Sequence, residues 1–175
     1  MKKTVLVIDD DKSNLIMAQR LLSDEYRVAA VNSGEKGLAY LEKGEPSLIL
    51  LDIQMPQMDG FAVMDKLRAH EKWCKIPVIF LTADKSSETE EKCFDMGARI
   101  PKGVDYIGKP FVPQIMRKRV TRTIELEEYR KSLEKMVMSQ LNQITRMQHD
   151  IIVSMANVIE SRDGTTGEHV KRTSK

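Results

Sequence analysis

Acidic residues follow short apolar runs at two places in this 175-residue sequence. Val5–Ile8 leads directly into the run Asp9–Asp11, and Leu48–Leu51 leads into Asp52 within the stretch LILLDIQMPQMDG. Two further apolar runs end in other polar groups: Val78–Leu81 in Thr82, and Val104–Ile107, one glycine later, in Lys109. A charged group at the end of a buried strand needs a chemical reason, and these side chains suggest one.

Clustered carboxylates repel one another and raise one another's pKa values unless a cation compensates them. Mg²⁺ suits a site with few carboxylates, some waters and a phosphate ligand. A carboxylate beside Mg²⁺ can attack a phosphoryl group and form an aspartyl phosphate. Lys109 could then pair with one phosphoryl oxygen, and Thr82 could donate a hydrogen bond to another. We therefore predict that the strand delivers Asp52 to a metal-bound phosphoryl site.

Each of these residues also has a purely structural explanation. A lone Asp after a strand is usually a turn residue or an N-cap, which is our expectation for Asp59. Asp9–Asp11 alone would be a loop, Lys109 alone a solvated charge, and Thr82 alone a helix cap. Their joint placement at four strand ends is what favours a site.

The elements that must position these groups alternate along the first two-thirds of the chain. Nearly continuous apolar runs indicate parallel strands covered on both faces by helices. Such a doubly wound α/β sheet binds ligands beyond the carboxyl ends of its strands. The predicted strands are Val5–Ile8, Arg27–Val31, Leu48–Leu51, Val78–Leu81 and Val104–Ile107, and the predicted helices are Asn14–Leu22, Phe61–Arg68 and Ser87–Met96.

Bulk composition narrows the classes of function. The net charge is +2, with 41% apolar and 31% charged residues, so no overall charge points to nucleic acid or a membrane. No stretch approaches the roughly 20 apolar residues of a membrane span, and the first apolar run is too short for a signal peptide. Cys74 and Cys93 lack metal-type spacing. We expect reduced thiols in a cytoplasmic protein.

After Pro113 the chain changes character, with no proline or glycine from 114 to 161. A helix of that length runs roughly 70 Å at about 1.5 Å per residue. Seven of ten heptad positions are apolar when d is set to Leu126, Leu133, Gln140, Met147 and Ser154, and a to Arg130, Val137, Ile144, Ile151 and Val158. We predict a parallel two-stranded coiled coil, in which the three polar positions fix the register. A surface helix with an ordinary amphipathic face is the alternative.

The segments VLVIDDD, LILLDIQMPQMDG, VIFLTA and DYIGKPF resemble the receiver domain of two-component response regulators, over about residues 3–117. The resemblance implies a flavodoxin-like five-stranded parallel sheet of order 2-1-3-4-5, and phosphorylation by a sensor histidine kinase. It also assigns residue roles by position. Asp52 is the phosphoacceptor, Asp10 binds Mg²⁺ directly with support from Asp9, and the backbone carbonyl of Gln54 is a further metal ligand. Thr82 and Tyr106 are the switch pair, and Lys109, with a cis bond to Pro110, completes the site.

One departure from the receiver pattern lies between Ala98 and Asp105, where the loop before the last strand is longer than usual. This loop borders the face that many receivers use for dimerisation. The departure does not touch the residues assigned to the chemistry.

The last 25 residues resemble the first helix and turn of HD-GYP domains, which are metal-dependent phosphodiesterases of cyclic di-GMP. The matching residues are Ile159–Asp163 and Thr166–His169. The resemblance implies that His169 is a metal ligand; an exposed histidine on a tail is the alternative. A His/Asp metal cluster needs several ligands from different helices. We therefore expect no phosphodiesterase activity from residues 1–175.

The dipeptide His149-Asp150 spells the same dyad, but it falls on outward f and g positions of the long helix. We read it as solvated surface.

Our prediction is a receiver at 1–117, a signalling helix at 118–150 that forms a homodimer, and the start of an output domain at 151–175. The intact protein would be a cyclic di-GMP phosphodiesterase. A receiver-like interaction module that never takes a phosphate is the main alternative. A dinucleotide-binding oxidoreductase is disfavoured because no glycine-rich loop follows the first strand. An Asp-x-Asp phosphatase is disfavoured because Gln54 stands where the second acid belongs.

Overall fold

The computed structural model describes residues 2–83 and 104–172. It contains a five-stranded, fully parallel sheet of order β2-β1-β3-β4-β5. This confirms the predicted fold, and each predicted strand is present with its ends extended by at most one residue. The strands are β1 (Thr4–Ile8), β2 (Arg27–Val31), β3 (Leu48–Asp52), β4 (Val78–Thr82) and β5 (Val104–Gly108).

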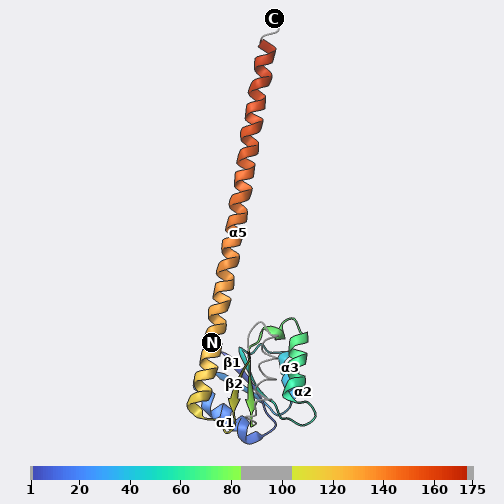
Figure 1. Ribbon diagram of the computed structural model, residues 1–175, viewed down its shortest axis with the longest axis vertical. Helices are drawn as coiled ribbons and strands as arrows, with labels where there is room; N and C mark the ends of the chain where they lie inside the picture. The colour runs from blue at the N-terminus through green and yellow to red at the C-terminus, as the bar shows by residue number, and fades with distance from the viewer. Residues whose placement is uncertain (1, 84–103, 173–175) are drawn as a thin grey trace. The chain divides into compact units, whose positions relative to one another are not determined.

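Helices connect the strands and cover the sheet on both faces (Figure 1). The predicted helix Ser87–Met96 and the long loop after Ala98 fall outside the described residues. α2 was not predicted from the sequence. The helices are α1 (Lys12–Leu22), α2 (Gly34–Leu41), α3 (Gly60–Ala69), the short 3-10 helix η1 (Trp73–Lys75) and α5 (Pro113–Arg172).

Two apolar layers hold the sheet between its helices. On one face, alternate residues of the strands pack against α1 and the first turns of α5, including Val7, Leu50 and Ile107. On the other, the intervening strand residues pack against α2 and α3, among them Ile8 and Phe80. β3 and β4 are buried along their whole length, as expected for central parallel strands covered on both faces.

The first turns of α5 belong to the core of the sheet domain. Met116 and Val120 are fully buried and Ile124 nearly so. The hydroxyls of Tyr26 and Thr121 lie 3.0 Å apart within hydrogen-bonding distance. Arg117 Nε donates to the carbonyl of Leu21 at 2.9 Å. These contacts fix the start of α5 to the α1 side of the sheet.

The chain divides into two compact units, residues 1–127 and residues 128–175, here called the first and second units. α5 runs without a break through the boundary. Among the described residues, no helix combines the length and the apolar character needed to cross a membrane.

α5 carries a row of exposed apolar side chains, all but the first of them in the second unit. All seven apolar a and d residues of the predicted heptads are between 41% and 63% exposed: Leu126, Leu133, Val137, Ile144, Met147, Ile151 and Val158. His149 and Asp150 are exposed as well, which fits their reading as solvated surface. In the described part of the single chain, each side chain of this row therefore keeps at least 41% of its surface exposed.

Candidate functional site

The parallel register brings the ends of β1 and β3 together. Ile8 pairs with Leu51, so Asp9, which follows β1, and Asp52, which ends β3, lie at the same edge of the sheet. Both carboxylates are buried, and Asp10 beside them is exposed. One carboxylate oxygen from each of Asp9, Asp10 and Asp52 lies within 4.8 Å of the other two. The structure thus gathers the three predicted carboxylates.

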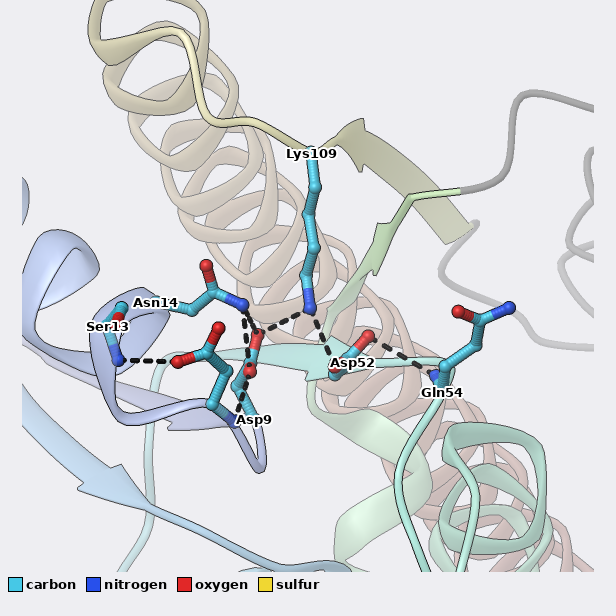
Figure 2. A network of polar contacts seen from close by, with 7 residues as sticks. Asp9, Ser13, Asn14, Asp52, Gln54 and Lys109 are labelled. Carbon is cyan, nitrogen blue, oxygen red and sulfur yellow. Dashed lines mark hydrogen bonds and ion pairs between the residues drawn. The ribbon is translucent and has the colours of Figure 1, made fainter.

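Lys109 bridges the two buried carboxylates (Figure 2). Its Nζ donates to Asp52 Oδ2 at 2.6 Å and lies 2.8 Å from Asp9 Oδ2. Its backbone amide donates to the carbonyl of Thr82 at 2.7 Å, which ties the chain after β5 to the end of β4. The Lys109–Pro110 bond is cis, as predicted. Two strands and one loop therefore place an ammonium between two carboxylates.

Asn14 is a site residue that the sequence did not reveal. Its Nδ2 donates to Asp9 Oδ1 at 3.0 Å and Asp9 Oδ2 at 3.1 Å, and the amide of Asp11 donates to Asp9 Oδ1 at 2.9 Å. Asp11 itself caps α1 by accepting from the amide of Ser13 at 2.8 Å. The cap begins α1 early enough for its first turn to reach the site. Within the acidic run, Asp9 is thus a buried residue of the site, Asp10 is exposed, and Asp11 caps α1.

The loop after β3 supports Asp52 from the other side. The amide of Gln54 donates to Asp52 Oδ1 at 3.3 Å (Figure 2). Asp59 caps α3, accepting from the amide of Ala62 at 2.7 Å, which is the structural role expected for it. The amide of Gly60 donates to the carbonyl of Ile53 at 2.9 Å. α3 therefore begins directly against the backbone that carries Asp52.

Burial and the contacts between Lys109 and the carboxylates have opposite effects on the pKa values of Asp52 and Lys109. Burial raises the pKa of the Asp52 carboxyl and the charge of Asp9 adds to the rise, against the opposing hydrogen bonds from Lys109 and the Gln54 amide. Burial alone would lower the pKa of Lys109, but its hydrogen bonds and its attraction to Asp52 and Asp9 outweigh burial and raise it. Lys109 therefore stays protonated. Burial makes the ionised form of Asp52 less stable in this site than it would be in water.

Thr82 and Tyr106 lie on the opposite face of the sheet from this cluster. Thr82 is buried at the end of β4 and pairs with Gly108, while Tyr106 pairs with Phe80. By strand alternation, both share the face of Phe80 and are diagonal neighbours across β4 and β5. The register thus makes the predicted switch pair diagonal neighbours, and Thr82 follows Leu81, the strand partner of Asp52, at the same edge of the sheet.

Comparison with known proteins agrees with this geometry. Residues 5–121 match the model of the response regulator receiver domain. A probable cyclic di-GMP phosphodiesterase of Vibrio cholerae is 33% identical over 97% of this chain and 39% of the relative. The cyclic di-GMP phosphodiesterase response regulator RpfG of Xanthomonas campestris is 26% identical over 97% of this chain and 46% of the relative. The chain thus spans less than half the length of these curated relatives.

A solved structure adds information about the metal. The receiver domain of a Pseudomonas aeruginosa sensor histidine kinase, described with a magnesium ion coordinated in its active-site cleft, has 27% identity and a TM-score of 0.63. The match covers 71% of this chain and 99% of that one. With its sheet order and its family match in agreement, this chain belongs to the response regulator receiver family.

Proposed function

We propose that the first unit accepts a phosphoryl group on Asp52 from a histidine kinase, with Mg²⁺ held by Asp9, Asp10 and Asp52. The observation that carries this proposal is the contact of Lys109 Nζ with both Asp52 and Asp9. A buried carboxylate beside a fixed ammonium and a second acid is placed to receive a phosphoryl group.

The donor set fits a hard divalent cation. Three carboxylate oxygens lie within 4.8 Å of one another, and oxygen ligands of this kind are those that Mg²⁺ prefers. The backbone carbonyl of Gln54 is proposed as a fourth ligand. When bound, the ion would neutralise negative charge on the phosphoryl oxygens.

The residues of the chain would divide the remaining tasks. Asp52 Oδ attacks the phosphorus and the bond to the donor's leaving group breaks, which leaves an acyl phosphate on Asp52. Lys109 releases its contact with the Asp52 carboxylate and pairs with a phosphoryl oxygen. Asn14 and the Asp11 amide keep Asp9 oriented throughout. Thr82 then turns toward the new phosphate, and Tyr106 moves into the vacated space.

We propose the output of this switch from the similarity of the chain to the two cyclic di-GMP phosphodiesterase relatives. Their matches extend over 97% of this chain, so they include most of α5. We propose a cytoplasmic protein with its receiver at 1–117, a signalling helix at 118–150, and the beginning of an HD-GYP-like phosphodiesterase at 151–175. His169 would be an early metal ligand in that domain, with cyclic di-GMP as the substrate of the whole protein.

Incubating the chain with Mg²⁺ and acetyl phosphate tests the phosphoryl site. We expect the intact mass to rise by one phosphoryl group, and Asp52→Asn to abolish the gain, because an amide is a poor nucleophile toward phosphorus. Native mass spectrometry at neutral pH is the measurement.

Asp59→Asn is the matched control, since Asp59 is exposed and caps α3, and it should be modified like the wild type. A wild-type chain that stays unmodified with donor and metal would instead support an interaction module that takes no phosphate.

We also propose that the second unit forms a parallel dimer through its apolar row. Four successive a positions, Val137, Ile144, Ile151 and Val158, carry β-branched side chains, which favour two-stranded parallel coiled coils. All four are more than half exposed in the single chain. A second copy of the same helix offers the complementary face in register.

Ile144→Asn should weaken this dimer by about a hundredfold, because it places a polar amide in an apolar layer of each helix. Sedimentation velocity over a concentration series measures the change. Ile152→Asn is the matched control: Ile152 is 65% exposed but occupies an outward b position, so its loss should leave the association unchanged. A wild-type chain that stays monomeric throughout the series contradicts the proposal.

A further inference from the structure

Arg119, on the first turns of α5, reaches the edge strand of the sheet. β5 is the last strand in the sheet order. The Arg119 guanidinium forms an ion pair with Asp105. Its central carbon lies 5.4 Å from the centroid of the Tyr106 ring, within the range of cation–π contacts. One arginine therefore contacts two consecutive residues of β5.

These two residues lie on opposite faces of the sheet. Ile107 belongs to the apolar layer on the α1 and α5 side, whereas Tyr106 packs against the layer on the α2 and α3 side. Because side chains alternate along a strand, Asp105 shares the α5 side with Ile107. Arg119 thus extends around the edge of β5: it forms an ion pair with Asp105 on one face, and its guanidinium lies beside the Tyr106 ring on the other.

Asp105 links Arg119 to the backbone of Tyr106 as well. Its Oδ1 accepts both from Arg119 and from the backbone amide of Tyr106, the latter at 2.9 Å. The backbone of Tyr106 and the guanidinium beside its ring are therefore held by one carboxylate. Val120, adjacent to Arg119, is fully buried in the core, so the helix backbone that carries Arg119 is fixed to the sheet.

We propose that Arg119 is a positioning residue that holds Tyr106 at the edge of β5 and couples the position of its ring to α5. This proposal rests on the proposed role of Tyr106 as a switch residue. Movement of the ring toward Thr82 separates it from the guanidinium but leaves the Asp105 ion pair in place. Arg119 therefore stabilises the position of Tyr106 seen here, and α5 loses one contact with the sheet when the ring leaves.

The test follows Tyr106 directly by fluorine NMR of the full chain labelled with 3-fluorotyrosine. The chain has four tyrosines, and a Tyr106→Phe variant identifies the resonance. We expect Arg119→Ala, without donor, to move this resonance toward its position in the phosphorylated wild type. Only the cation–π contact differs between the two ring positions, and its usual strength corresponds to up to about a fivefold change in their ratio.

Two further variants separate positioning from a general loosening of α5. Arg117→Ala removes another arginine of the same helix, one that donates to Leu21 instead of contacting β5, and should leave the Tyr106 resonance in place. Arg119→Lys keeps a charge for Asp105 but lacks the planar group, and should give a partial shift. Amide hydrogen exchange over residues 116–124 should respond to the phosphodonor in the wild type and in Arg117→Ala, but not in Arg119→Ala.

The outcomes are distinct. An unchanged Tyr106 resonance in Arg119→Ala, or an equal shift in Arg117→Ala, overturns the role of Arg119. Intact mass measured on the same samples reports phosphorylation separately. If the wild type is never modified, the proposed phosphoryl function fails, while the spectra without donor still decide whether Arg119 holds the ring.

Discussion

Replacing Lys109 with methionine is expected to destabilise the first unit by roughly 3 kcal/mol in the absence of divalent cations. The Lys109 side chain is only 16% exposed and contacts two buried carboxylates. Its loss leaves Asp9 and Asp52 facing each other without their common partner. Urea denaturation measures the effect through Trp73, the single tryptophan of the chain, which lies in the first unit.

The same substitution should slow modification of Asp52 by acetyl phosphate about a hundredfold, the usual loss when a fixed donor to a developing anion is removed. Saturating Mg²⁺ should recover much of the stability but not the rate, since the ion restores charge balance without replacing the contact of the ammonium. Lys36→Met is the matched control: Lys36 is an exposed lysine whose Nζ donates to Asn32 Oδ1 at 2.7 Å. Equal losses in both variants would contradict the role given to Lys109.

The deficit of Lys109→Met should also depend on pH. Lys109 opposes the rise in the pKa of Asp52, so its removal raises that pKa further above the ordinary value. The folded state then binds more protons than the unfolded state, and stability increases as pH falls toward the raised pKa. Denaturation curves without metal should therefore show the gap to the wild type shrinking as pH falls through the raised pKa of Asp52, above the ordinary range of a carboxyl group.

A second large effect is expected from Gly60→Ala, at about 3 kcal/mol of lost stability. A Cβ at Gly60 would lie 2.3 Å from the carbonyl oxygen of Asp52 and 2.9 Å from the Cα of Ile53. Both are main-chain atoms, so no side-chain rotation relieves the overlap. The start of α3 must move away from the backbone of β3, which displaces Asp52 as well. We expect slower phosphorylation together with the lower free energy of unfolding.

Gly44→Ala provides the control for this prediction. Its Cβ would meet only the ring of Tyr40, at 2.9 Å, and that side chain can turn aside. Denaturation of both variants under identical conditions compares a main-chain clash with a side-chain clash. A Gly60→Ala chain as stable as Gly44→Ala would show that the loop after β3 yields more easily than its geometry indicates.

The sheet and the acidic cluster were largely predictable because local patterns encode them. Continuous apolar runs mark buried parallel strands, and the parallel topology alone brings the residues after β1 and β3 to one edge. The position of Lys109 then followed from the strand before it. Thr82 was placed in the site by its position at the end of a strand, whereas Tyr106 and the switch role of the pair required the family resemblance, because a tyrosine inside a strand shows no function by its spacing.

The parts that were missed depend on tertiary contacts. α2 contains Gly34 and Gly37, which weaken a helix signal, yet a Cβ at these positions would lie 2.6 Å from Val63 and 2.4 Å from Ile8. The glycines are there for close packing, which no periodicity reveals. Asn14 enters the site only because Asp11 caps α1 and sets the start of its first turn. Arg119 meets β5 through an arrangement that has no local pattern.

The burial of Val120 and Ile124 determines where the chain can be cut to give a stable receiver fragment. A fragment ending at residue 117 keeps every residue of the acidic cluster but loses both side chains, which would open the apolar layer against α1 and β5. The hydroxyl contact between Tyr26 and Thr121 would go with them. Fragments and chimeras that exchange receiver domains should therefore join after Glu127, because the peptide that leaves the domain is also part of what keeps it folded.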